Sequence, residues 1–368
     1  MKHFCFLSGL YQRNDVLIFG RQGKSLVSAG YQVTYIVCDE KQNEIVDGIR
    51  IISTGFAPKS RKERWLKSKS ILLRAALKVD ADIYQISDPE LVSLVEPLKR
   101  NNKKVIFNMR EYYPDMLRGK YYIPSMLRNI ISCSYENLMR NTLKKYDAVF
   151  IVTTWILDIV QREWGVKKSY LLTNYPWLNP NHSFTFQEYC NRGNVLCYEG
   201  TIYKNSRQEN VFKALEALPE VHYILAGKIH EDSSYIKNLT YWKKVEFING
   251  FNIGDLKKIF ARSTIANVFR DFGGRDGSLG VIKIFESMEA ALPVLLADVP
   301  LYQGIVEKYH CGICVDPNNP KQIEDAIRFL VQNKEEAYQM GQNGRKAVIE
   351  EYNWENQAKN YIEIINQL

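Results

Sequence analysis

The chain has 368 residues, of which 46% are apolar and 24% charged, and its formal net charge is +8. This composition is typical of a globular protein and excludes a disordered or fibrous chain, and the length predicts two domains of roughly 150 to 200 residues. No apolar run reaches the roughly 18 to 20 residues that a transmembrane helix needs, so no membrane span is predicted.

The first half of the chain alternates short apolar segments with helix-length amphipathic segments. The apolar segments are rich in β-branched and aromatic residues, and the first one ends without the small-residue cleavage site of a signal peptide. Alternation of this kind predicts a parallel sheet covered by helices. The predicted strands are HFCFLSG, VTYIVCD, IYQIS, KVIFNM and AVFIVTT, and the clearest helical patterns are GRQGKSLVSAG and PSMLRNIISCSYENLMRNTLKKY.

Positive charge is concentrated in residues 1–176, which hold 28 lysines and arginines against 17 acidic residues. Within them, Lys59–Lys78 has eight basic residues, one acid and several large apolar side chains, and this pattern predicts a basic amphipathic helix. The helix either packs on the core with its charges in water, or lies on an anionic membrane surface. Nucleic acid is not an expected partner, because no zinc-type or aromatic-interleaved motif accompanies the charges.

The alternation pauses in TNYPWLNPNHSFTFQEYCNRG and resumes with a second series of strands. We therefore predict an N-terminal domain at 1–174, a linker at 175–192, a second domain at 193–352 and a C-terminal helix at 353–368. The fold class is α/β, with two doubly wound Rossmann-like domains that face a cleft and bind ligands at the carboxyl ends of their strands. The strands of the second series are NVLCYEG, HYILAG, KVEFING, STIANVFRD, PVLLAD and CGICVDP.

The cysteines do not form a recognisable framework. Their odd number, seven, and their scatter through apolar segments indicate reduced thiols in a cytoplasmic protein. Cys311 and Cys314 are spaced like a redox or zinc pair, but they lie in a predicted strand, and no further zinc ligands at similar spacing follow. We predict that both pack in the core.

In the stretch GVIKIFESMEAALPVLLAD, Lys283, Glu286 and Glu289 stand in an apolar context, where an unpaired buried charge is costly. It follows a loop with glycines and begins a predicted helix, whose N-terminus favours a phosphate. Lys283 in the first turn adds a cation, and Glu286 on the same face can accept two ribose hydroxyls. The spacing also fits an ordinary Lys–Glu pair on a solvated face. Glu289, one turn further on, is expected to face solvent or to cap the helix.

These segments resemble family 4 retaining glycosyltransferases of the GT-B fold, especially bacterial members that build surface polysaccharides. The blocks occur in that family's order and spacing along nearly the whole chain, and the last is similar to a closing helix that crosses back to the first domain. The similar blocks are RNDVLIFGRQGKSLVSAGYQVTYIV, DIYQISDPELVSL, VIFNMREYYPD, CYEGTIYKNSRQENVFKALEALPEVHYILAG, KIFESMEAALPVLLAD and IEEYNWENQAKNYIEII.

The resemblance implies a hexosyltransferase-type enzyme (EC 2.4) that moves a sugar from a UDP or GDP sugar to a hydroxyl of a lipid-linked glycan, with retention of configuration, in capsule or lipopolysaccharide synthesis. It implies no tightly bound cofactor and no metal. The expected partners are the nucleotide sugar, a glycan or polyprenyl-linked acceptor, and an anionic membrane at the inner face of the cytoplasmic membrane, contacted through Lys59–Lys78. The alternative is a non-catalytic relative that binds nucleotide, glycan or a protein partner.

The resemblance also implies roles for individual residues. Glu286 would hold the ribose, and Lys283 with Arg207 would bind the diphosphate. The remaining residues of the implied donor site are Gly200, Thr201, Asn252, Gly274, Arg275, Gly277, Ser278 and Leu279.

Three positions depart from the family pattern. Ser278 stands where many members have a glutamate, Thr201 where arginine is frequent, and Arg110 where a histidine precedes a glutamate. Because arginine cannot be deprotonated at neutral pH, we expect Arg110 to clamp an anionic group and Glu111 to polarise the acceptor hydroxyl. A structural salt bridge at a strand end is the alternative for both. The Asp80–Asp82 segment is similar to a metal-binding DxD motif, but it precedes a strand and is interpreted as a surface turn.

Overall fold

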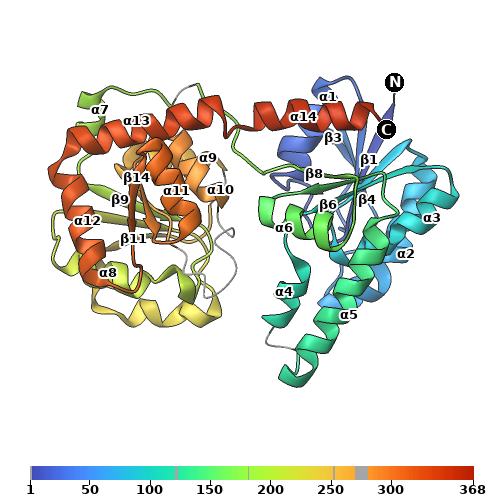
Figure 1. Cartoon of the computed structure of the whole chain (residues 1–368), viewed down its shortest axis with the longest axis horizontal. Coiled ribbons are helices and arrows are strands. Elements are labelled where there is room, and N and C mark those ends of the chain that lie inside the picture. The colour runs from blue at the N-terminus through green and yellow to red at the C-terminus, as the bar shows by residue number, and fades with distance from the viewer. Residues whose placement is uncertain (1, 121–122, 181, 252, 270–280) are drawn as a thin grey trace. The chain divides into compact units, whose positions relative to one another are not determined.

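The computed structural model describes residues 2–120, 123–180, 182–251, 253–269 and 281–368 (Figure 1). The chain divides into two compact units, one made of Met1–Asn174 with Glu355–Leu368 and the other of Tyr175–Trp354. Each unit has its own sheet and its own core, in agreement with the predicted α/β class.

The sheet of the first unit is parallel except at one edge. β1 (His3–Ser8) lies inside it, with β2 (Gln32–Val37) on one side and β5 (Ile83–Ile86) on the other. The chain therefore changes direction of winding between β1 and β5, which is where ligands bind in such sheets. The full order is β3 (Glu44–Val46), β4 (Ile49–Ser53), β2, β1, β5, β6 (Lys104–Met109), β7 (Ala148–Ile151) and β8 (Ser169–Leu171), and β3 is antiparallel to β4.

Helices cover both faces of this sheet, so its central strands are buried throughout, as is usual in parallel sheets. The C-terminal helix α14 (Trp354–Asn366), red in Figure 1, packs on the first unit as predicted: Tyr361 is fully buried and donates to Gln85 over 2.7 Å. The other helices are η1 (Ile18–Gly23), α1 (Lys24–Ser28), α2 (Arg61–Val79), η2 (Pro89–Leu94), α3 (Val95–Arg100), α4 (Tyr113–Arg118), α5 (Ser125–Leu143), α6 (Thr154–Asp158) and η3 (Ile159–Glu163).

The predicted basic helix is α2, which begins after Ser60, whose hydroxyl accepts from the backbone N–H of Glu63 over 3.1 Å. Its apolar residues divide into two groups. Leu72 and Ala76 are fully buried in the core, whereas Trp65 is 48% exposed and Leu66 is 70% exposed. Packing on the core therefore accounts for only part of its apolar surface. None of the helices in the described ranges is long and apolar enough to cross a membrane.

The second unit has a six-stranded sheet that is parallel throughout. β9 (Val195–Glu199) lies between β10 (His222–Ala226) and β12 (Ile265–Asn267), so the winding changes direction between β9 and β12. The full order is β11 (Val245–Ile248), β10, β9, β12, β13 (Val294–Ala297) and β14 (Gly312–Val315).

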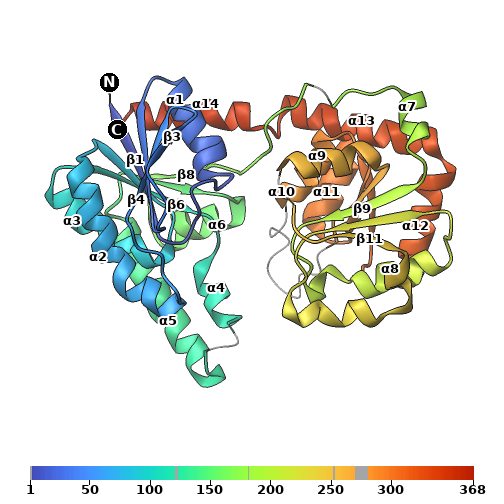
Figure 2. The ribbon, with the colours of Figure 1, turned by 180° about the vertical axis from the view of Figure 1, so that it is seen from behind.

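Two groups of helices cover this sheet. Figure 2 shows α8 (Gln208–Glu216) with α12 (Pro320–Gln332) on one face, and α9 (Ile253–Arg262), α10 (Val281–Glu289) and α11 (Pro300–Tyr309) on the other. Each face has its own cluster of buried side chains. The remaining helices are α7 (Phe186–Asn191), η4 (Lys204–Ser206), η5 (Glu231–Asn238), η6 (Thr240–Lys244) and α13 (Lys334–Glu350).

The expectation that Glu289 faces solvent or caps its helix is wrong. Its side chain is only 6% exposed, and it forms an ion pair with Arg345 at 3.0 Å. Its carboxylate also accepts from the backbone N–H of Asn179 over 2.8 Å and lies 2.6 Å from His182 Nδ1. Because its partners come from distant parts of the chain, Glu289 ties the segment after the first unit to α10 and α13.

Cys311 and Cys314 pack as predicted. Cys311 is fully buried beside α10 and α13, and Cys314 is partly buried on β14. Burial raises the pKa of both thiols to about 12, so neither forms the thiolate that redox chemistry requires at neutral pH.

Candidate functional site

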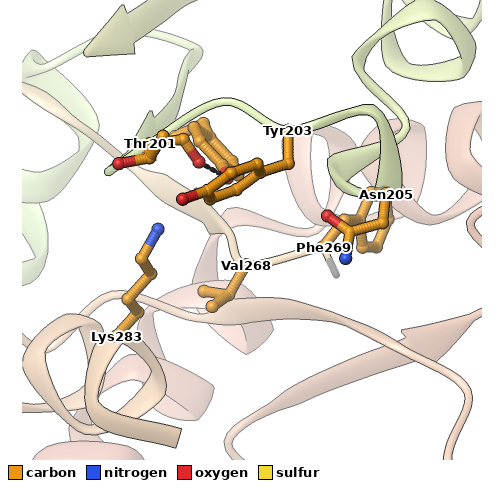
Figure 3. Close-up of a pocket in the computed structure, with 7 residues that line it drawn as sticks. Thr201, Tyr203, Asn205, Val268, Phe269 and Lys283 are labelled. Carbon is orange, nitrogen blue, oxygen red and sulfur yellow. Dashed lines mark hydrogen bonds between the residues drawn. The ribbon is translucent and has the colours of Figure 1, made fainter. Parts of the chain in front are cut away.

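A narrow pocket in the second unit lies where the winding of its sheet changes direction. Residues that follow β9 form one side, residues that follow β12 form another, and Lys283 reaches in from α10 (Figure 3). Ligands of open parallel sheets bind at this position. The lining residues are Tyr198, Thr201, Tyr203, Asn205, Val268, Phe269 and Lys283.

Gly200 makes room for Lys283. The Lys283 ammonium donates to the backbone oxygen of Glu199 over 2.6 Å and lies 4.9 Å from the centre of the Tyr198 ring. A Cβ atom on Gly200 would lie 1.9 Å from Lys283 Nζ, and the φ of Gly200 is +108°, which other residues rarely adopt. Only glycine therefore permits this contact.

A second glycine brings the next loop close. The φ of Gly227, which follows β10, is +143°, and a Cβ atom there would lie 1.9 Å from the backbone oxygen of Gly200. The N–H of Gly200 donates to Ala226 over 2.9 Å, so the ends of β9 and β10 support each other. The sequence resemblance indicated Gly200 but gave no sign of Gly227.

Two polar atoms in or near the pocket lack partners. Among the described residues, Oδ1 of Asn205, which lines the pocket, and Oε1 of Glu199, whose backbone oxygen accepts from Lys283, are buried and accept no hydrogen bond. Burial raises the pKa of Glu199, and the nearby Lys283 ammonium opposes this shift. The free volume is about 10 Å³, about one water molecule. The pocket can therefore take one small group of a ligand, such as a phosphate oxygen, rather than a whole nucleotide.

The structure brings together three of the residues implied for the donor site, namely Gly200, Thr201 and Lys283. Glu286 lies on α10 three residues after Lys283 and is half-buried. Arg207, with a φ of +48°, is the residue before α8, and neither residue lines the pocket. The other implied residues, Asn252, Gly274, Arg275, Gly277, Ser278 and Leu279, lie outside the described residues.

Sequence reasoning missed most of the pocket wall. Tyr203 and Asn205 stand in the loop after β9, and Val268 and Phe269 follow β12 directly. Their position just after predicted strands was the available signal, because loops at the carboxyl ends of parallel strands form ligand sites.

In the first unit, Arg110 forms the salt bridge that was the alternative to an anion clamp. Its Nη1 atom lies 3.0 Å from both carboxylate oxygens of Asp15, and its guanidinium lies 4.0 Å from the centre of the Tyr11 ring. Asp15 and Arg110 are 14% and 19% exposed. The charge of Arg110 is therefore balanced within the unit.

Asp88, which sequence reasoning overlooked, organises the loop after β1. It is fully buried and accepts hydrogen bonds from the Ser8 hydroxyl at 2.9 Å, the Gly9 N–H at 2.6 Å and the Leu10 N–H at 2.8 Å. Burial raises the pKa of Asp88 to about 7, although these three donors favour the ionised form. Asp88 thereby fixes the loop after β1, in which Tyr11 contacts the guanidinium of Arg110.

Glu111 lines a second, larger pocket, with a volume of about 380 Å³. Residues after β1, β5 and β6 contribute to it, together with side chains of α2, α4 and α5. This pocket lies where the winding of the first sheet changes direction, the same position as the narrow pocket in the second sheet.

The DxD-like segment is part of a turn, as interpreted. Asp80 follows the last residue of α2, has a φ of +52° and pairs with Lys103, and its side chain is 73% exposed. Asp82 accepts from the backbone N–H of His3 over 2.7 Å. No group of three or more His, Cys, Asp or Glu side chains in the described part of the chain is placed to hold a metal ion.

Comparison with known sequences finds similarity to glycosyltransferases. Residues 186–347 match the model of the family described as glycosyl transferases group 1. An uncharacterized glycosyltransferase of Methanocaldococcus jannaschii is 27% identical over 187 residues, which cover 47% of this chain and 45% of that protein. The chain thus spans about half the length of the curated relatives it matches.

Solved structures match along the whole chain. Sucrose-phosphate synthase from Thermosynechococcus elongatus has a TM-score of 0.75 at 16% identity, and the match covers 100% of this chain and 99% of that one. Anabaena HepE, solved in complex with UDP-glucose, has a TM-score of 0.69 at 11% identity and full coverage of both chains. At these identities the matches establish a shared fold.

Proposed function

We propose that this chain transfers a sugar from a nucleotide diphosphate sugar to a hydroxyl of a glycan acceptor. Residues 186–347 match the model of the glycosyl transferases group 1 family, and the structure has the GT-B fold. The contact between Gly200 and Lys283 carries the proposal. It fixes a cation at the ligand-binding position of the second sheet, beside atoms that still lack hydrogen-bond partners.

A fixed cation suits this chemistry because the leaving group is a diphosphate. As the bond between the anomeric carbon and the diphosphate oxygen breaks, negative charge grows on the diphosphate, and a preorganised ammonium stabilises it. Lys283 supplies that ammonium in our proposal, with Arg207 as a second cation. Glu286, one helical turn along α10, accepts the ribose hydroxyls.

The remaining donor contacts stay proposals based on sequence. Gly200 and Thr201 follow β9, and the resemblance of the sequence is the ground for proposing that Gly274, Arg275, Gly277, Ser278 and Leu279 contact the donor sugar and that Asn252 contacts the base. The donor is a UDP or GDP sugar, and the UDP-glucose bound to Anabaena HepE favours UDP. We propose that transfer retains the configuration of the sugar and requires no metal.

On the acceptor side, Glu111 polarises the attacking hydroxyl. Arg110 binds an anionic group, and its pair with Asp15 holds the guanidinium in position until then. We propose a lipid-linked glycan acceptor and a role in surface-polysaccharide synthesis at the inner face of the membrane. The exposed Trp65 and Leu66 among the basic residues of α2 support contact with anionic lipid.

The test is calorimetric titration of UDP, GDP, ADP and CMP into the wild type and into Lys283→Ala and Glu286→Ala. We expect selective binding of one nucleotide, weakened by about 1 to 3 kcal/mol in each variant because a hydrogen bond to a charged group is lost. Lys308→Ala, which removes an exposed lysine paired with Glu351, is the matched control and should bind like the wild type.

The outcomes separate the possibilities. If the folded wild type binds none of the nucleotides, the proposal fails. If it binds one nucleotide but never releases it from the corresponding sugar donor in the presence of acceptor glycans, the non-catalytic alternative replaces the enzyme.

A further inference from the structure

Helix α5 has an apolar face that the first unit leaves exposed. We call it the α5 stripe and define it by five side chains, Met126, Leu127, Ile130, Ile131 and Leu138. All five are exposed, and Met126 and Ile130 are the most exposed of them, at 87% and 62%. Neighbouring apolar side chains on the surface of a folded chain commonly mark an interaction surface.

The stripe is additional to the face that α5 packs on the core. Side chains three or four residues apart are neighbours on a helix, so Met126 lies beside Ile130, and Leu127 beside Ile131. A second set of side chains with the same spacing faces the core: Ser132, Tyr135, Met139, Thr142 and Leu143. Figure 1 shows the N-terminal end of α5 extending beyond the sheet of the first unit. The packing of this unit therefore does not account for the stripe.

The face that carries the stripe has no charge. With 3.6 residues per turn, the same face also holds four exposed polar or small side chains, Cys133, Ser134, Asn137 and Asn141. The charged residues of α5 project from the rest of the helix and are Arg128, Glu136 and Arg140. Apolar side chains with uncharged polar neighbours are typical of a protein interface, whose centre is depleted of charge.

This composition differs from that of a helix that lies on a membrane. Such helices carry lysines and arginines beside their apolar face, as α2 does beside the exposed Trp65 and Leu66. Each of those cations gains energy near anionic lipid, whereas the serine and asparagines beside the α5 stripe gain none. A protein surface is therefore the favoured occupant of the stripe.

The stripe is complementary to itself. Its apolar side chains can pack on those of a second copy, and an asparagine side chain both donates and accepts, so it can pair with an identical residue. A two-fold contact between two α5 helices thus places no like charges opposite each other. A different protein would be attracted by the excess positive charge of residues 1–176, which this face lacks.

We propose that the α5 stripe is the interface of a homodimer in which the α5 helices of two copies pack against each other across a two-fold axis. One pair of helices gives an interface at the low end of the usual sizes, so we expect a micromolar dissociation constant. The proposal does not depend on the proposed function.

The test is sedimentation velocity of the whole chain at micromolar to submillimolar concentrations. We expect the wild type to change from monomer to dimer as its concentration rises. Ile130→Glu should weaken the dimer at least about tenfold, because two identical carboxylates would meet in an apolar contact. Leu138→Glu, at the other end of the stripe, should act in the same direction. Both positions are exposed and glutamate favours helix, so we expect both variants to fold.

A matched variant and the ionic strength provide controls. Ile349→Glu changes an exposed isoleucine on α13, in the second unit, and should dimerise like the wild type. Because residues 1–176 of two copies repel each other, salt should strengthen the dimer by screening that repulsion. Salt would instead weaken an attraction between basic residues and anionic lipid.

The proposal is overturned if the wild type stays monomeric at every concentration, or if Ile349→Glu weakens the dimer as much as Ile130→Glu does. Species larger than a dimer contradict the two-fold arrangement, because a two-fold contact closes on itself. Cosedimentation with phosphatidylserine vesicles tests the other occupant. A monomeric wild type whose vesicle binding is lost in Ile130→Glu would show that lipid covers the stripe.

Discussion

In each sheet the winding of the chain changes direction at one position, between β1 and β5 in the first unit and between β9 and β12 in the second. We call these positions the switch points, and different groups occupy them. In the first unit, Asp88 fills the position and accepts hydrogen bonds from Gly9 and Leu10. In the second, Gly200 and Gly227 leave space, and Lys283 supplies a positive charge. Backbone N–H groups at such positions commonly bind a phosphate. The first unit satisfies these N–H groups with its own carboxylate, whereas the second places the ammonium of Lys283 at the end of β9.

The largest effect should come from closing the space in the second unit. Gly200→Ala places a methyl group 1.9 Å from Lys283 Nζ and so displaces the ammonium, and we expect nucleotide affinity to fall about 100-fold, roughly 3 kcal/mol. Gly193→Ala is the control, because Gly193 also has a positive φ, +81°, but nothing lies within 4 Å of its added Cβ. Both variants should lose some stability through backbone strain. Calorimetric titration with the bound nucleotide distinguishes them, and equal affinities would contradict the role of the Gly200 contact.

A smaller effect should follow from removing the carboxylate that fills the first switch point. The pKa of Asp88 is raised to about 7 in the folded protein, above its unfolded value of roughly 3.9. At a pH between these two values, the folded state therefore keeps a proton that the unfolded state has released. The stability of the wild type should therefore decrease as the pH rises from about 4 to about 7, at up to roughly 1.4 kcal/mol per pH unit. Asp88→Asn lacks this proton and should lose that part of the slope.

Urea unfolding of both proteins between pH 5 and pH 7 measures the difference, which we expect to reach about 2 kcal/mol. The other titrating groups are common to both proteins, so the difference between the two profiles reports Asp88 together with its interaction with Glu90. Parallel stability profiles would show that the environment of Asp88 does not favour its protonated form.

The smallest effect concerns the contrast in charge between the two halves of the chain. Residues 1–176 carry an excess of 11 positive charges, whereas the remainder carries an excess of 3 negative charges. If α2 contacts anionic lipid, Lys62→Gln should weaken binding to vesicles that contain phosphatidylserine by about 1 kcal/mol, roughly fivefold. Lys41→Gln removes an exposed lysine outside α2 and should have little effect. An equal loss in both variants would attribute the binding to net charge alone.

Sequence alone was sufficient for the features that repeat over a few residues. Alternating apolar segments predicted the two parallel sheets, and the charge pattern of Lys59–Lys78 predicted α2. The resemblance also assigned both Gly200 and Lys283 to the donor site, and the structure places them beside each other. These predictions depend on local periodicity and on motifs that can be recognised without knowing what lies beside them.

The tertiary structure decided which charges are buried and with what partners. Glu289 looked like a solvated residue until folding brought Arg345 to it from 56 residues away, and Asp88 meets Ser8 across 80 residues. Glu90, whose side chain is 2% exposed, likewise meets Arg64 from 26 residues away. A sequence window records which residues can ionise, but only packing determines how much water each loses and which group replaces that water.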